Sequence, residues 1–166
     1  ELKLSGKVAP RKIESCPVMF CDIVGFTQIA ETLAPEELIS ELDLCFAHFE
    51  RAMGSNHLEK IKTIGDSFMC AGGLSEPGRL HAVDTVLCAL RIQEFMRKHF
   101  KSRSRRGLPA WHLRIGVHTG PVVAGILGQE RFNYDIWGDS VNTANRMEAA
   151  GEADRINISR QTADLV

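Results

Sequence analysis

Two apolar parts of the chain each carry an aspartate at the point where a strand should end. The segment Cys16–Val24 is a nearly continuous apolar run that contains Asp22. The segments Leu58–Ile64 and Ser67–Ala71 are separated by a glycine and Asp66. Short apolar runs bounded by turn residues predict buried strands, and a two-residue connection predicts a hairpin. A lone buried carboxylate is costly, so this pattern requires a fold that gives Asp22 a partner or a bound metal.

Helical and strand patterns alternate along the rest of the chain. Apolar spacing predicts a helix from Pro35 to Gly54 and a second helix from His81 to Phe100. Helices that return across one sheet indicate an α+β sandwich of the ferredoxin-like type. The core-facing side chains are expected to be Leu38, Leu42, Cys45, Phe49 and Met53 in the first helix, and Val83, Val86, Leu87 and Leu90 in the second. The other expected elements are strands over Trp111–Val117, Pro121–Leu127, Phe132–Trp137 and Arg155–Ile158, a helix from Gly138 through Ala150, and a helix from Gln161 to the chain end.

Composition excludes several classes of function. The net charge is −1, so no global basic field favours nucleic acid. The basic run Arg97–Arg106 is interpreted as a helix end that runs into a solvated loop; a membrane-surface or regulatory role is the alternative. The five cysteines form no C-x-x-C pair and indicate free thiols in a reducing compartment. No apolar stretch is long enough to cross a bilayer, so we expect a single cytoplasmic domain over residues 1–166 without membrane contact, with residues 1–14 as a linker.

Carboxylates from two neighbouring strand ends can hold a pair of divalent cations, which suits chemistry on a polyphosphate. Asp22 and Asp66 are therefore candidate metal ligands. Each also has a simpler interpretation. Asp22 can cap the helix that follows, and a glycine–aspartate pair is ordinary turn chemistry. The backbone amides of 24–27 open that helix and can bind phosphate oxygens.

Lys62 and Asp135 are a candidate pair for reading a purine, a pairing that the family resemblance given below implies. Adenine presents an acceptor at N1 and a donor at its 6-amino group, which a lysine and an aspartate complement. Guanine presents the reverse pattern, so the same pair would leave its groups mismatched. The simpler interpretation is an exposed strand lysine and a surface turn aspartate.

Asn142 and Arg146 lie four residues apart on one expected helix and therefore share a face. They are candidate polar ligands for a substrate, although the polar side of an amphipathic helix has the same spacing. His118 is interpreted as a structural histidine rather than a base.

Three motifs together resemble the catalytic domain of class III nucleotidyl cyclases. They are Asp22-Ile23-Val24-Gly25-Phe26-Thr27, Ile61-Lys62-Thr63-Ile64-Gly65-Asp66 and the run from Trp137 to Met147. The resemblance implies a palm-type antiparallel sheet with helices packed on it. It also implies two Mg²⁺ or Mn²⁺ ions on Asp22, Asp66 and the Ile23 carbonyl: one ion activates the ribose 3′-hydroxyl, and the other stabilises the leaving pyrophosphate. Phe26 and Thr27 would contact the substrate, Asn142 would orient the ribose, and Arg146 would stabilise charge at the α-phosphate.

Within the resembled family, adenylyl cyclases place lysine with aspartate or threonine where Lys62 and Asp135 stand, whereas guanylyl cyclases typically place glutamate and a small residue. The resemblance therefore implies an adenylyl cyclase domain that converts ATP to 3′,5′-cyclic AMP and pyrophosphate at sites shared across a homodimer. The alternatives are a guanylyl cyclase, a diguanylate cyclase or polymerase-like palm, and a non-catalytic nucleotide-binding or dimerisation module.

The family domain usually continues with further strands and a basic residue that reaches the triphosphate, and none follows Val166 here. Asn145 stands where the family often has serine. We expect regulatory domains, and any membrane anchor of the parent protein, to lie in flanking sequence.

Overall fold

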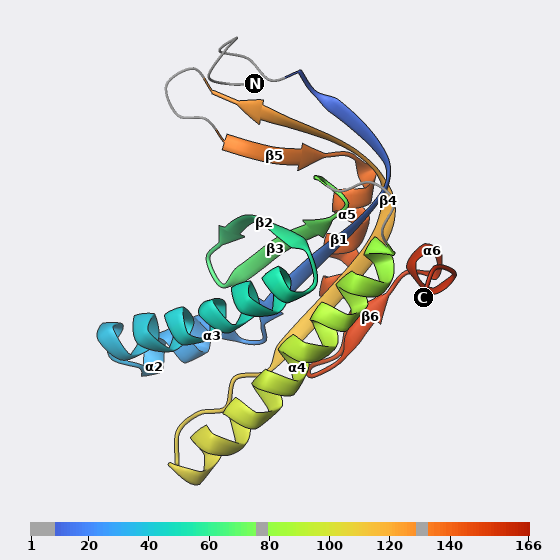
Figure 1. The fold of residues 1–166 in the computed structure, drawn as a ribbon. Helices are drawn as coiled ribbons and strands as arrows, with labels where there is room; N and C mark the ends of the chain where they lie inside the picture. The colour runs from blue at the N-terminus through green and yellow to red at the C-terminus, as the bar shows by residue number, and fades with distance from the viewer. Residues whose placement is uncertain (1–8, 76–79, 129–132) are drawn as a thin grey trace.

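The chain forms an α+β domain in which helices cover a mostly antiparallel sheet, as the sequence predicts (Figure 1). The computed structural model describes residues 9–75, 80–128 and 133–166. Within these residues the strands follow the order β2-β3-β1-β4-β5, and β6 pairs with β4 as the one parallel neighbour. The strands are β1 (Arg11–Ile23), β2 (Leu58–Ile64), β3 (Ser67–Gly72), β4 (Leu113–Leu127), β5 (Asn133–Trp137) and β6 (Ile156–Ile158); the helices are α2 (Phe26–Thr32), α3 (Pro35–Ser55), α4 (His81–Arg105), α5 (Asp139–Ala149) and α6 (Arg160–Ala163).

Two hydrophobic clusters lie on opposite faces of the sheet. The larger cluster joins α3 and α4 to one face, and the smaller one places α5 against the other (Figure 1). Helix α3 buries Cys45, Phe49 and Met53, with Leu38 and Leu42 partly buried beside them, which confirms the expected stripe. Strands β1, β4 and β5 continue beyond the helices as a curved arm (Figure 1).

Helix α4 turns a different face to the core than its leucines suggest. Leu87 and Leu90 are exposed, and Val83 and Val86 are only half-buried, so the expected inner face was wrong. Small side chains allow a helix to lie close to a sheet, and the buried face of α4 is rich in small side chains. The buried residues of α4 that face the protein are Ala82, Thr85, Cys88, Ala89, Ile92 and Met96.

Strand β4 is one continuous strand where the sequence suggested two. Gly120 and Pro121 do not turn the chain. In the pairing of β1 with β4, Cys16 lies opposite Gly120 and Ile13 opposite Val122, with a bulge in β1 between them. Pro121 falls opposite that bulge, so its missing N–H breaks no regular ladder bond.

The chain ends also differ from expectation. Strand β1 begins at Arg11, so four residues of the expected linker belong to the sheet. Helix α6 stops at Ala163 and does not continue to the end of the chain. Helix α4 continues to Arg105, and Arg103 inside the basic run is buried, with its guanidinium 2.6 Å from a carboxylate oxygen of Glu41. That run is therefore only partly a solvated helix end.

Several simpler expectations are confirmed. All five cysteines are buried free thiols, and burial raises the pKa of Cys16, Cys45 and Cys88 to about 12. His118 is buried and shares a hydrogen bond of 2.8 Å with the Ser159 hydroxyl, which fits a structural histidine. Among the helices that the structure describes, none is long and apolar enough to span a membrane.

Candidate active site

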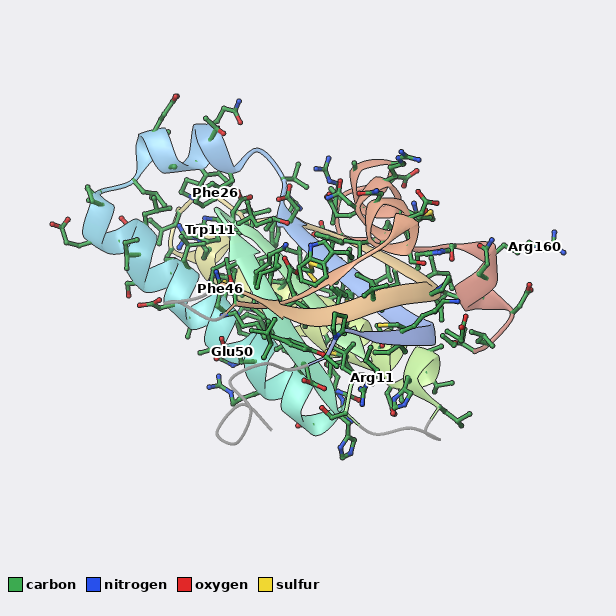
Figure 2. The ribbon with its side chains drawn as sticks, turned by 90° about the horizontal axis from the view of Figure 1, so that it is seen from above. Arg11, Phe26, Phe46, Glu50, Trp111 and Arg160 are labelled. Carbon is green, nitrogen blue, oxygen red and sulfur yellow. The ribbon has the colours of Figure 1, made fainter. Side chains whose placement is uncertain are left out.

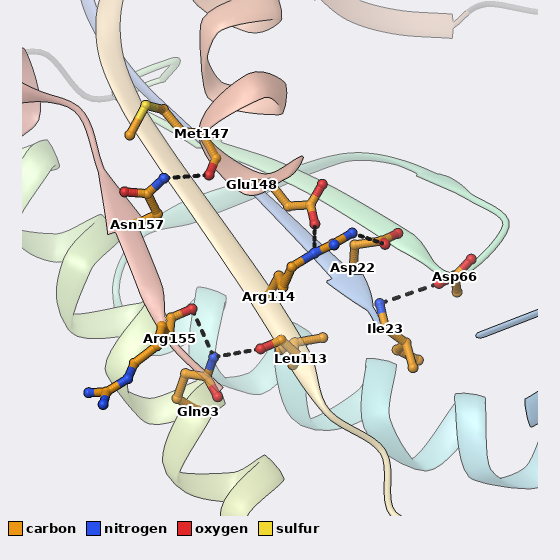
Figure 3. A network of polar contacts seen from close by, with 10 residues as sticks. All are labelled: Asp22, Ile23, Asp66, Gln93, Leu113, Arg114, Met147, Glu148, Arg155 and Asn157. Carbon is orange, nitrogen blue, oxygen red and sulfur yellow. Dashed lines mark hydrogen bonds and ion pairs between the residues drawn. The ribbon is translucent and has the colours of Figure 1, made fainter. Parts of the chain in front are cut away.

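Asp22 and Asp66 are brought together at one edge of the sheet, as the sequence predicts. Strands β1 and β3 are antiparallel neighbours, so the end of β1 lies beside the turn that precedes β3. The Asp66 carboxylate accepts a hydrogen bond of 3.3 Å from the backbone amide of Ile23, the residue after Asp22 (Figure 3). Gly65, at φ +62°, provides the left-handed turn that leads into Asp66. We refer to Asp22, Asp66 and their charged neighbours as the metal edge.

The electrostatics of the metal edge favour a bound cation. Burial, together with the nearby carboxylates of Asp66 and Glu148, raises the pKa of Asp22 to about 6 against the opposing effect of Arg114. Like charges held this close disfavour simultaneous ionisation. A divalent cation between the carboxylates would relieve that repulsion.

Sequence reasoning missed two residues of the metal edge, Arg114 and Glu148. Arg114 lies directly opposite Asp22 in the β1–β4 register. Its Nη2 donates to Asp22 Oδ2 at 3.3 Å, and its Nε donates to Glu148 Oε1 at 2.8 Å (Figure 3). The alternation of Leu113 and Ile115 toward the core signals that Arg114 faces the other way, but the register that brings it to Asp22 is not readable from the sequence.

The donor set at the metal edge fits ions that complete their shell with substrate oxygens. In the described parts of the chain, no group of three or more His, Cys, Asp or Glu side chains could hold a metal ion by itself. Mg²⁺ commonly binds one or two carboxylates and takes its remaining ligands from water and phosphates. Two aspartates at a strand edge are sufficient for that mode.

Lys62 and Asp135, from β2 and β5, also meet. The Lys62 ammonium lies 2.6 Å from Asp135 Oδ2. The two residues line a cavity of about 410 Å³, which we call the base edge. The cavity is lined by Lys60, Ile61, Lys62, Asn133, Tyr134 and Asp135.

A bulge in β2 directs Lys62 toward the base edge. Lys60 pairs with Cys70 and Lys62 with Met69, so Ile61 is an extra residue. In a regular strand, residues two apart share a face. Here the Lys60 ammonium turns to α3 and lies 2.7 Å from Glu50, whereas Lys62 is on the opposite face with Met69. The bulge thus aims one lysine away from the helices and toward Asp135.

Asn142 and Arg146 are exposed on α5 and are not part of either edge within this chain. The buried side of α5 carries Ser140, Ala144 and Glu148, which are spaced four residues apart and face the sheet. The two candidate catalytic side chains therefore point outward, away from their own metal edge.

Phe26 and Thr27 lie in the first turn of α2, which begins after the left-handed Gly25. The Phe26 ring packs edge-on against Trp111, with ring centroids 6.4 Å apart (Figure 2). The amide of Val24 donates to the His112 carbonyl at 2.9 Å. Of the amides expected to meet phosphate, the one at Val24 is therefore already bonded, and no side chain caps the helix.

The sequence profile of the adenylate and guanylate cyclase catalytic domain matches residues 8–166. The chain belongs to this family. The cyclase domain is 41% identical to human guanylyl cyclase C over 166 residues, 99% of this chain but 15% of that protein. It is 40% identical over 147 residues to an adenylate cyclase of Mycobacterium tuberculosis, 89% of this chain and 32% of that protein. The chain thus spans less than a third of these relatives.

A solved structure supports the fold. The adenylyl cyclase CyaB from P. aeruginosa superposes with a TM-score of 0.88 at 29% identity, covering 95% of this chain and 82% of that chain. The palm-type cyclase fold expected from the resemblance is confirmed. The relatives include both adenylyl and guanylyl cyclases, so membership in the family leaves the base open.

Proposed function

We propose that the cyclase domain is an adenylyl cyclase, which converts ATP to 3′,5′-cyclic AMP and pyrophosphate. The observation that carries this choice is the contact of 2.6 Å between Lys62 and Asp135 at the base edge. The ammonium can donate to N1 of adenine, and the carboxylate can accept from the 6-amino group. Guanine would set its N1–H against the ammonium and its O6 against the carboxylate. A site built from such groups discriminates by roughly 10⁴-fold.

Asp22, Asp66 and the Ile23 carbonyl would hold two Mg²⁺ or Mn²⁺ ions. The ions supply charge neutralisation for the triphosphate and acidify the attacking hydroxyl. Arg114 adds a guanidinium at the same edge, where it can bind phosphate oxygens. The free first-turn amides of α2 at Phe26 and Thr27 offer further phosphate contacts.

The active site would form between two copies of the chain. The support for this is that Asn142 and Arg146 are exposed on α5, whereas Ser140, Ala144 and Glu148 form its buried side. In a head-to-tail homodimer, one copy would supply the metal edge, and the other would supply Asn142 to the ribose and Arg146 to the α-phosphate. Each dimer would then hold two equivalent sites.

A guanylyl cyclase is the second candidate, because the chain is 41% identical to guanylyl cyclase C. The base edge argues against it. The deciding experiment supplies equimolar ATP and GTP with Mn²⁺ and identifies the cyclic nucleotide. Cyclic AMP is the expected product, and cyclic GMP as the main product would refute the assignment. Absence of both products, together with no binding of an ATP analogue by calorimetry, would support a non-catalytic module.

We propose that the domain is cytoplasmic and that flanking sequence supplies its regulation, including any membrane anchor of the parent protein. The support is that the chain covers only 15% of guanylyl cyclase C, so most of such a relative lies outside the catalytic domain.

A further inference from the structure

Arg114 has two unequal partners at the metal edge. Its Nε donates to Glu148 at 2.8 Å, whereas its Nη2 lies at the longer distance of 3.3 Å from Asp22 (Figure 3). The side chain of Glu148 is 6% exposed, compared with 26% for Asp22. The shorter bond is therefore also the more deeply buried one.

Cations at the metal edge would change these two contacts in opposite ways. Ions bound to Asp22 would compensate its charge and repel the neighbouring guanidinium. Glu148 is too buried to be left unpaired, because removing the partner of a buried ion is strongly destabilising. The Arg114–Glu148 bond would persist, and the Nη2 side of the guanidinium would become free to donate to another oxygen.

The backbone that carries Glu148 is held rigidly against the sheet. A Cβ on Gly116 of β4 would lie 2.0 Å from the Glu148 amide nitrogen, so only glycine permits this close approach of α5. The side-chain amide of Asn157 on β6 donates to the Met147 carbonyl at 2.7 Å (Figure 3). These contacts fix the position of the carboxylate that holds Arg114.

We propose that Glu148 is a positioning residue that anchors Arg114 for binding of the substrate's polyphosphate once cations occupy the metal edge. The residue does not touch the substrate; it fixes the guanidinium by Nε so that its other N–H groups face the phosphate oxygens. This inference rests on the proposed function in one respect, namely that a triphosphate binds beside Asp22 and Asp66.

The test separates the phosphate part of the ligand from the base. Calorimetry with Mn²⁺ and inorganic tripolyphosphate measures binding of the phosphate part, and NMR titration with adenosine measures binding of the base. Glu148→Gln should weaken tripolyphosphate binding by about tenfold, the loss expected for a charge-assisted hydrogen bond. Adenosine binding should stay within about twofold, since the base edge is untouched. Glu152→Gln, an equal charge change at an exposed site of the same region, should alter neither.

A general loss of structure would weaken the binding of both ligands, whereas loss of the Arg114 anchor would weaken the binding of tripolyphosphate alone. Glu148→Asp keeps the charge but withdraws it by one methylene, so it should weaken tripolyphosphate binding by less than tenfold. This variant serves as the test if Glu148→Gln does not fold. In an Arg114→Ala background, Glu148→Gln should cause no further loss. Equal tripolyphosphate affinity of the wild type and both Glu148 variants would overturn the inference alone. If the wild type failed to bind tripolyphosphate, the proposed function would fail with it.

Discussion

The metal edge and the base edge differ in how well each balances its charge inside one chain. At the metal edge the described residues place the carboxylates of Asp66 and Glu148 near that of Asp22, and the guanidinium of Arg114 pairs with Asp22 and Glu148. At the base edge one ammonium faces one carboxylate at 2.6 Å. The first edge carries excess negative charge, and the second is paired before any ligand arrives.

This difference indicates what each edge requires from a ligand. An edge with excess negative charge gains stability from cations, and through them from a polyphosphate. A paired edge gains nothing from charge and instead offers a fixed donor and acceptor. Affinity is thus expected to come mainly from the metal edge, and base selection from the base edge.

The largest expected effect follows removal of a metal ligand. Asp66→Ala should lower turnover by at least about 10³-fold, because the ions that would compensate the triphosphate charge would lose one of their two carboxylate ligands. Asp43→Ala, a change at an exposed site on α3, is the matched control and should leave turnover unchanged. Circular dichroism checks that both variants fold. Near-full activity of Asp66→Ala with Mg²⁺ would show that the carboxylates have only a structural role.

The next effect sharpens the assignment of the base edge. Replacing Lys62 with Glu and Asp135 with Cys should shift the ATP-to-GTP ratio of kcat/KM by about 100-fold or more toward GTP. Lys98→Gln, a change at an exposed lysine of α4 that pairs with Glu94, is the matched control and should not change base preference. A double variant that still strongly prefers ATP would mean that adenine is read elsewhere.

The smallest expected effect is on the stability of the metal-free domain. The pKa of Asp22 is about 6 in the folded domain, above its unfolded value of about 3.9. A raised folded pKa means that the stabilising contribution is present below the unfolded value and is lost as pH rises through about 6. Asp22→Asn should therefore gain stability over the wild type between pH 5 and 7.5, by at most about 3 kcal/mol in EDTA.

Chemical denaturation at these two pH values measures the change. If Asp22→Asn raised the free energy of unfolding by the same amount at pH 5 and at pH 7.5, the charge of Asp22 would not be the cause. Mn²⁺ should stabilise the wild type more at pH 7.5 than at pH 5, since protons compete for the same carboxylate.

Patterns within single segments predicted much of the fold and of the site. The turn at Asp66, the strand end at Asp22 and the stripe of α3 follow from local chemistry and spacing, and the structure brings Lys62 and Asp135 together as the base-reading hypothesis requires. Arg114 and Glu148 were missed because they depend on the register of β1 with β4 and on the contact of α5 at Gly116. Neither the strand register nor the helix contact leaves a local signal in the sequence. The inner face of α4 was wrong because close packing selected Cys88 and its small neighbours over the leucines.

The central claim is that the metal edge of one chain and Arg146 of a second copy complete one site of a homodimer that reads adenine. Asp22→Ala and Arg146→Ala chains are mixed and supplied with equimolar ATP and GTP. Each variant alone should be inactive, because every site would lack one required group. The mixture should recover about a quarter of wild-type turnover as cyclic AMP, since half of randomly paired dimers would hold one intact site of two. No recovery when heterodimers are shown to form, or recovery as cyclic GMP, would contradict the account.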